Sequence, residues 1–120
     1  METLHRSPGG EPVLVAAATG PPIAATQDAL DLIGAAFGRA GTVAVPAGRL
    51  DDRFFTLRTG LAGEIMQKFV NYRIRLVVVG DISAHVAAST ALRDLVRESN
   101  RGTHVWFVEN LAALDAKLAP

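Results

Sequence analysis

Short apolar runs alternate along the chain with stretches in which apolar residues recur at helical spacing. Four runs have the length and composition of buried strands, namely 12–18, 42–46, 76–79 and 104–108. The run 76–79 is apolar at every position, which indicates burial on both faces of a parallel sheet. The segment 23–25 follows a Thr-Gly-Pro-Pro turn and could return as a short strand beside the first run.

Four helices are predicted between and after these strands, at 26–37, 59–72, 83–100 and 110–118. Thr26 and Asn110 are the expected N-caps of the first and last helices, because their side-chain oxygens can accept orphan backbone N–H groups. Thr59 or Gly60 opens the second helix. Asn100 stands near the predicted C-terminal stop of the third.

The element order β-β-α-β-α-β-α-β-α predicts a single α/β domain over residues 12–120, with a small mixed, mostly parallel sheet and about four helices. The first two strands would form an antiparallel pair at one edge, and the pattern leaves the strand order open. Residues 1–11 are polar and contain Pro8, Gly9 and Gly10, so we expect a mobile N-terminal tail there.

Composition and charge remove several classes of function. The chain has no cysteine, which excludes a disulfide scaffold, a thiolate nucleophile and a zinc site built on sulfur. Twelve Lys and Arg residues balance twelve Asp and Glu residues, so no basic field attracts nucleic acid. The apolar runs are too short to cross a membrane and no apolar leader is visible, so we expect a cytoplasmic protein. The sequence carries no metal set, nucleotide motif or catalytic triad, and we expect no cofactor and no metal.

The stretch from Phe54 to Phe69 carries the main candidate site. The helix start within it would offer unpaired backbone N–H groups and a partial positive charge to an anion. Gly60 and Gly63 would let a ligand approach the backbone closely, and Arg58 could add a fork of donors. The alternative interpretation is structural: Thr59 caps the helix, and the glycines let it pack tightly against a strand.

Asp81 is a second candidate, because it follows a buried parallel strand and sites in open α/β sheets lie beyond the carboxyl ends of strands. On that logic Asp81, Arg58 and Thr59 could converge on one mouth, with Glu109 or Asn110 nearby. Alternatively, Asp81 caps the next segment through its side chain.

Aromatic and histidine side chains allow both functional and structural interpretations. Phe54 and Phe55 are expected to anchor their loop to the core, although an exposed partner patch is the alternative. Trp106 is either a core ring or an anchor for a partner on the other face of the sheet. His85 and His104 are not at a metal-ligand spacing, which favours structural roles.

Four motifs carry a resemblance to a known family: ALDLIG (29–34), FF-x-LRTGLAGEIMQKFVNYR (54–73), VGDIS (79–83) and ALRDLVRESNRG (91–102). Through them the chain from Ala29 to Leu118 resembles a small bacterial family known only as a domain of unknown function, and the resemblance implies no activity. The chain is more weakly similar to the STAS domains, the bacterial anti-sigma-factor antagonists.

The STAS resemblance rests on the element order and on the turn that opens the second helix. STAS domains place Asp-Ser-Ser-Gly at this turn, where the present chain has Leu57-Arg58-Thr59-Gly60. The glycine matches and Thr59 replaces the second serine, but Arg58 stands where the phosphorylated serine would be. The resemblance therefore implies a STAS-like fold without the phosphorylation switch.

These observations predict a non-enzymatic regulatory or interaction module that binds a protein partner, a second copy of itself or a small ligand near residues 58–63. The alternative is a small enzyme, or a small-molecule-binding protein of a bacterial biosynthetic pathway, that uses Arg58, Asp81 and His85 in a pocket at the strand ends. A pocket that holds a carboxylate of perturbed pKa beside Arg58 would favour the second interpretation. A flat, exposed apolar surface around the aromatic residues would favour the first.

Overall fold

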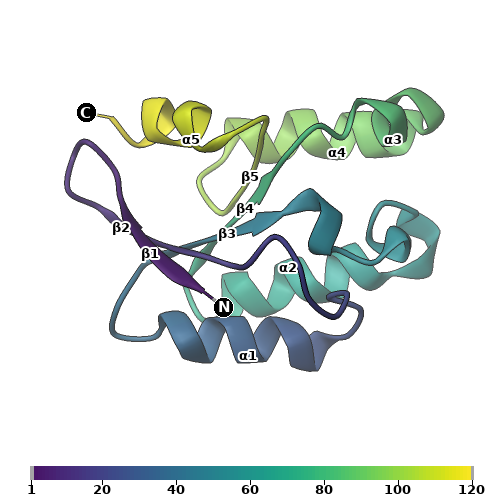
Figure 1. Ribbon diagram of the computed structural model, residues 1–120. Coiled ribbons are helices and arrows are strands. Elements are labelled where there is room, and N and C mark those ends of the chain that lie inside the picture. Colours follow the sequence, from purple (N-terminus) through teal and green to yellow (C-terminus); the bar gives the residue numbers. More distant parts are fainter. Residues whose placement is uncertain (1, 120) are drawn as a thin grey trace.

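The computed structural model describes residues 2–119, and within them a five-stranded mixed sheet has the order β1-β2-β3-β4-β5 (Figure 1). The strands are β1 (Thr3–Arg6), β2 (Pro12–Val15), β3 (Thr42–Pro46), β4 (Arg75–Val79) and β5 (Val105–Val108). The α-helices are α1 (Thr26–Ala36), α2 (Leu61–Asn71), α3 (Ser83–Ala88), α4 (Thr90–Arg101) and α5 (Leu111–Leu118). Three short 3-10 helices connect β3 to α2, namely η1 (Ala47–Arg49), η2 (Asp52–Phe54) and η3 (Leu57–Thr59). The predicted α/β fold with a mostly parallel sheet is confirmed, since only β1 and β2 pair antiparallel among these strands.

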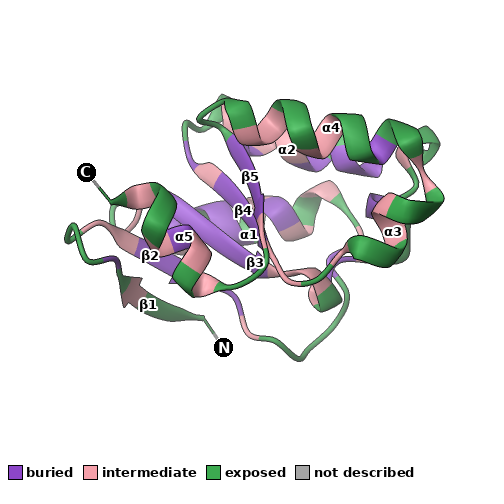
Figure 2. Cartoon of the chain, turned by 90° about the horizontal axis from the view of Figure 1, so that it is seen from above, coloured by how far each residue is buried: buried purple, intermediate pink, exposed green. Residues whose placement is uncertain are grey.

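The helices cover the two faces of the sheet unequally because the parallel strands follow one another in chain order. Right-handed crossovers between successive neighbours bring each connecting helix to the same face. α1, α2 and α4 accordingly pack on one face, over a large apolar cluster that includes Val43 and Leu76. α5 covers the other face, where Leu114 packs with Val77 and Trp106. Figure 2 shows the buried strands between these layers and the exposed outer side of α4.

The sheet order also decides where a site can form. Doubly wound folds bind ligands in a crevice at the point where the strand order reverses. The order of the described strands never reverses, so these strands form no crevice of that kind. Because β3 and β4 are parallel neighbours, the segments that follow them start side by side at the carboxyl edge of the sheet. Those segments are the η1–η3 connection and α3.

The N-terminal segment differs from the prediction of a mobile tail. Residues 3–6 form β1, which pairs with β2 from Thr3 opposite Val15 to Arg6 opposite Pro12. His5 adds a contact across the sheet, with its Nε2 atom 2.8 Å from Oδ1 of Asp115 on α5. Four mostly polar residues carry little hydrophobic periodicity, so the backbone ladder that holds them leaves no clear pattern in the sequence.

The predicted strand at 23–25 is reduced to a single bridge. Ile23 lies parallel to Leu50, with its N–H donating to the Arg49 carbonyl at 2.7 Å. Pro21 and Pro22 precede it and have no N–H to donate, so a longer ladder cannot extend in that direction. The antiparallel edge pair that the sequence predicted is therefore made by β1 and β2 instead.

The predicted helix at 83–100 is two helices, α3 and α4. The backbone of Ser89 is extended, with φ −147° and ψ 111°, and its hydroxyl accepts the N–H of Leu92 at 3.1 Å. Ser89 is therefore the N-cap of a new helix rather than an interior residue.

No helix within residues 2–119 combines the length and the apolar character needed to span a bilayer.

The start of α1 also differs from the prediction that Thr26 is its N-cap. Thr26 is the first helical residue, and Ala25 occupies the cap position. The Asp28 carboxylate accepts the N–H groups of Ala24 at 2.9 Å and Ala25 at 3.1 Å. A side chain in the first turn thus stabilises this helix start, as in half of a capping box. Asn110 is the N-cap of α5 as predicted, accepting the Ala113 N–H at 2.8 Å.

Candidate functional site

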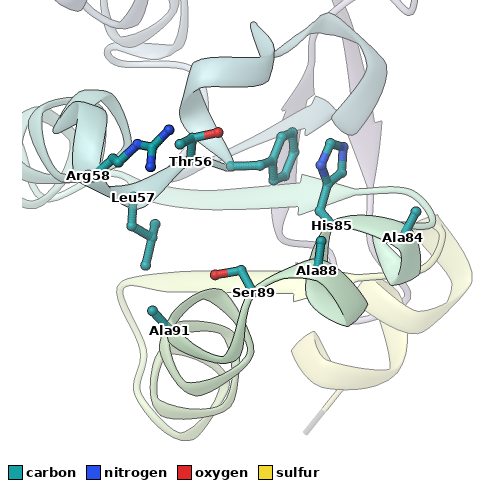
Figure 3. Close-up of a pocket in the computed structure, with 9 residues that line it drawn as sticks. Thr56, Leu57, Arg58, Ala84, His85, Ala88, Ser89 and Ala91 are labelled. Atoms are coloured by element: carbon teal, nitrogen blue, oxygen red, sulfur yellow. The ribbon is translucent and has the colours of Figure 1, made fainter.

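A groove of about 500 Å³ opens at the carboxyl edge of the sheet (Figure 3). One wall is the segment 55–58, from the connection between β3 and α2, and the other is formed by α3 and the start of α4. Its apolar lining consists of Phe55, Leu57, Ala84, Ala88 and Ala91, and its polar lining of Thr56, Arg58, His85 and Ser89. The volume lies in the range of sites for small organic ligands.

The first wall is fixed to the core by two adjacent aromatic rings. Phe54 and Phe55 are both buried, and their rings meet edge to face with centroids 5.2 Å apart. Asp51 is the N-cap of η2 just before them, and its carboxylate accepts the N–H of Arg53 at 3.0 Å. The prediction that these phenylalanines anchor the loop is confirmed, and the anchored loop presents the residues that follow to the groove.

His85 joins the two walls. Its imidazole stacks on the Phe55 ring with centroids 4.1 Å apart and the planes 11° from parallel (Figure 3). Neither ring nitrogen of His85 hydrogen-bonds to another residue in the described part of the chain. The stack therefore holds α3 against the loop through an apolar contact and leaves the polar edge of the ring available.

Arg58 supplies the charge of the groove. It is exposed, and its guanidinium forms neither an ion pair nor a hydrogen bond with any of residues 2–119. Carboxylates are absent from the lining, so nothing in the groove neutralises this cation. The Ser89 hydroxyl accepts the Leu92 N–H and keeps its own proton to donate, and the Thr56 hydroxyl adds a second donor. The groove thus offers several donors and a positive charge above an apolar floor.

Thr59 and Gly60 have backbone roles beside the groove. The Thr59 hydroxyl lies 2.6 Å from the Arg53 carbonyl and 2.8 Å from the Thr56 carbonyl, to which it can donate, and it accepts the Leu61 N–H at 3.3 Å. Gly60 is the N-cap of α2 with φ +80°, a left-handed conformation that favours glycine. Together they hold the turn that leads into α2. The N-cap is Gly60 rather than Thr59, so Thr59 supports the turn just before the cap position.

Gly63 contradicts the packing interpretation. A Cβ atom built on it would meet no heavy atom within 4 Å outside the local helix, so Gly63 makes no tight contact with a strand. It lines a separate hollow of about 720 Å³ along α2, together with Gly60, Glu64 and Lys68. This hollow carries charges of both signs and does not include Arg58.

Asp81 lies outside the Arg58 groove. Its carboxylate accepts the Ser83 N–H at 2.9 Å, which confirms the interpretation that it caps the next segment. Hydrogen bonds from the Ser83 side chain and backbone hold the pKa of Asp81 below its ordinary value. Asp81 lines a smaller hollow of about 210 Å³ with Glu109, so the predicted convergence of Asp81 with Arg58 and Thr59 does not occur.

Trp106 belongs to the core. Its ring is buried under α5, with the Arg75 guanidinium 4.2 Å and the Lys117 ammonium 4.7 Å from the ring centroid. Its Nε1 donates to the Gly102 carbonyl at 2.8 Å. The partner-anchor interpretation of Trp106 is therefore wrong.

Within residues 2–119, no group of three or more His, Asp or Glu side chains is placed to hold a metal ion.

The family described as Domain of unknown function (DUF4180) matches residues 9–118. The chain belongs to this family. Neither a curated protein nor a solved structure matches it. The DUF4180 match contains both walls of the groove and begins after β1.

Within this DUF4180 domain the sequence identified only part of the groove. Arg58 and His85 were candidates, and the structure places both in the lining. Thr56 and Ser89 were missed, because nothing in the spacing indicates which way a loop hydroxyl or a helix break will face. Ala84 and Ala88 were a usable signal, since small residues four apart on one helix leave room beside it.

Proposed function

We propose that this DUF4180 domain is a non-enzymatic binding module whose groove takes a small anionic ligand with a flat apolar body. The observation that carries the proposal is the Arg58 side chain, which lines an apolar groove with neither a hydrogen-bond partner among residues 2–119 nor a carboxylate in the same lining. Figure 3 shows its guanidinium beside Thr56. This combination matches the usual make-up of a ligand site, in which an apolar lining surrounds a few convergent polar groups.

The anionic end of the ligand would bind at Arg58. A guanidinium donates two parallel hydrogen bonds to a carboxylate or phosphate, and such charge-assisted bonds are about twice as strong as neutral ones. The hydroxyls of Ser89 and Thr56 lie in the same lining and would add neutral donors. A cationic ligand finds no charged acceptor among these side chains.

The body of the ligand would lie between the walls. Leu57 on one wall and Ala84 and Ala88 on the other provide apolar surface, and the small alanine side chains leave the groove open. The exposed edge of the His85 imidazole would donate or accept one hydrogen bond, with the ring orientation fixed by its stack on Phe55. A planar group can stack against the parallel rings of Phe55 and His85, so it suits the groove better than a bulky aliphatic group does.

We propose binding rather than catalysis because the groove contains no activated nucleophile. An activated hydroxyl needs a base within hydrogen-bond reach. His85 hydrogen-bonds to neither Ser89 nor Thr56 in the described chain, and the Ser89 hydroxyl is engaged as a helix cap. The STAS resemblance supports a regulatory role, in which occupancy of the groove would alter the contact with a protein partner.

Native mass spectrometry of the protein purified gently from its own host tests this proposal. We expect one small acidic molecule per chain, lost in Arg58→Gln and retained in the matched control Arg39→Gln. Arg39 is also exposed, but it lies beyond α1 and donates to the Ala35 carbonyl at 3.3 Å. Retention of the same molecule by Arg58→Gln, or a bound protein in place of a small molecule, would overturn the proposal.

A further inference from the structure

The two edges of the sheet are treated differently. At the β5 edge, the Asn100 side chain accepts the Phe107 N–H at 2.7 Å and donates to the Phe107 carbonyl at 3.2 Å. This amide occupies the place that a neighbouring strand would take. β1 forms the opposite edge, and no strand within residues 2–119 covers its outer side (Figure 1). An uncovered edge is a template for pairing with another chain.

The backbone groups on the outer side of β1 follow from its register. The Ser7 N–H donates to the Glu11 carbonyl at 3.0 Å, which makes this pair a hydrogen-bonded one. Hydrogen-bonded and non-bonded pairs alternate along an antiparallel ladder. Arg6 opposite Pro12 and Leu4 opposite Leu14 are therefore non-bonded pairs. The N–H and C=O groups of Leu4 and Arg6 consequently point away from β2.

The side chains of this edge are complementary to themselves. Leu4 and Arg6 lie on the same face of β1, and Glu2 directly precedes the strand. In a ladder extended by that one residue, the side chains of Glu2, Leu4 and Arg6 would share one face. When two copies run antiparallel with Leu4 opposite Leu4, each Glu2 stands opposite the Arg6 of the other copy. Leu4 itself is 48% exposed and would contact its counterpart on the two-fold axis.

We propose that two copies of this chain associate through β1, in antiparallel register centred on Leu4, and extend the two sheets into one. The backbone groups of Leu4 and Arg6 would form the ladder, and the two Glu2–Arg6 pairs would fix the register against a slip. The interface is isologous, as a two-fold dimer requires. It lies on the β1 edge, away from the Arg58 groove, and does not depend on the groove being occupied.

Sedimentation velocity over a concentration series, at low ionic strength and with no tag at the N-terminus, tests the pairing. We expect a reversible dimer that weakens with added salt, because the charge pairs lie at the surface. Glu2→Arg alone and Arg6→Glu alone would each place like charges opposite one another and weaken the dimer about tenfold or more. The double variant Glu2→Arg/Arg6→Glu restores complementarity and should restore the dimer.

A second variant addresses the backbone ladder. Leu4→Pro removes an N–H that points outward and leaves the bonds between β1 and β2 in place, so it should abolish the dimer while the chain stays folded. Fluorescence of Trp106, the only tryptophan, reports whether the fold is intact. A wild-type chain that sediments as a monomer throughout the series would overturn the proposal. So would a dimer that Leu4→Pro and both single charge reversals leave unchanged.

Discussion

The two glycines at the start of α2 should respond to alanine with opposite signs. Gly60 has φ +80°, where a Cβ atom strains the backbone. Gly63 lies in the first turn of the helix, and a Cβ atom there meets open space. From the sequence alone both glycines have the same predicted role, in which a ligand approaches the backbone, so an account based on that role would treat them alike. The structure separates them by backbone conformation.

The magnitudes follow from the two conformations. A left-handed residue other than glycine costs about 1–2 kcal/mol, and the lower entropy of the unfolded alanine chain returns about 0.4–1 kcal/mol. Gly60→Ala should therefore destabilise the protein by about 1 kcal/mol. Gly63→Ala should stabilise it by about 0.5 kcal/mol, at the lower end of the helical difference between glycine and alanine, because it lies in the first turn.

Equilibrium unfolding in urea, followed by Trp106 fluorescence, measures both changes in the free energy of unfolding. Gly34→Ala is the matched control, since Gly34 lies in the last turn of α1 and a Cβ atom on it would meet nothing within 4 Å. This control should gain up to about 1 kcal/mol. A loss of stability in Gly63→Ala, with a gain in Gly34→Ala, would refute the reasoning and revive a packing role for Gly63.

Three further substitutions test the contacts that hold the fold. Asn100→Ala removes both side-chain bonds to the Phe107 backbone and should cost about 1–3 kcal/mol in the free energy of unfolding, because those groups lose their partners. Arg73→Gly should stabilise the protein by about 0.5–1 kcal/mol, because Arg73 adopts φ 57° after the end of α2, and thermal unfolding would show a raised Tm. Asp51→Asn should lose stability at neutral pH, since hydrogen bonds from the Arg53 backbone and side chain hold the pKa of Asp51 below its ordinary value of 3.8. The folded-state pKa is lowered, so this contribution is present above pH 3.8 and disappears as the pH falls through the folded-state pKa, which acid titration of both proteins would follow.

Controls distinguish these effects from general sensitivity to substitution. Asn71→Ala is matched to Asn100→Ala, because the Asn71 side chain is exposed and bonds to the Gln67 side chain at 2.8 Å. It should change the free energy of unfolding by less than about 0.5 kcal/mol. Equal losses in the two asparagine variants, a lowered Tm in Arg73→Gly, or an Asp51→Asn deficit that persists at the lowest pH would each contradict the corresponding prediction.

The sequence predicts the inner part of the fold well because β3 and β4 are buried on both faces and read as continuous apolar runs. It fails where backbone pairing or a single cap decides the structure. β1 is held by its ladder with β2 rather than by apolar periodicity, and the break between α3 and α4 depends on the Ser89 hydroxyl. Neither the polar residues of β1 nor a single serine can be distinguished in the sequence from the polar residues around them.

The candidate site was predicted in part for a related reason. Arg58 and His85 follow two neighbouring parallel strands, so the topology brings their segments together at one edge. Thr59, Gly60 and Asp81 have local structural roles instead. The side chains of Thr59 and Asp81 hydrogen-bond to nearby backbone groups, and Gly60 adopts a positive φ at the helix start. Sequence spacing places residues at an edge of the sheet and leaves the direction of each side chain undetermined.

A titration of the ¹⁵N-labelled protein with phenyl phosphate tests the central claim most directly. The account predicts saturable shifts of the backbone amides along 55–58 and 84–91, the two walls of the groove. Because the charge-assisted bonds are lost, the wild-type protein should bind uncharged benzyl alcohol at least about tenfold more weakly than phenyl phosphate. For the same reason Arg58→Gln should bind phenyl phosphate at least about tenfold more weakly than the wild type. Arg39→Gln should bind phenyl phosphate as the wild type does. Shifts that fall elsewhere, or equal binding of phenyl phosphate by Arg58→Gln, would contradict the assignment of this groove as an anion-binding site.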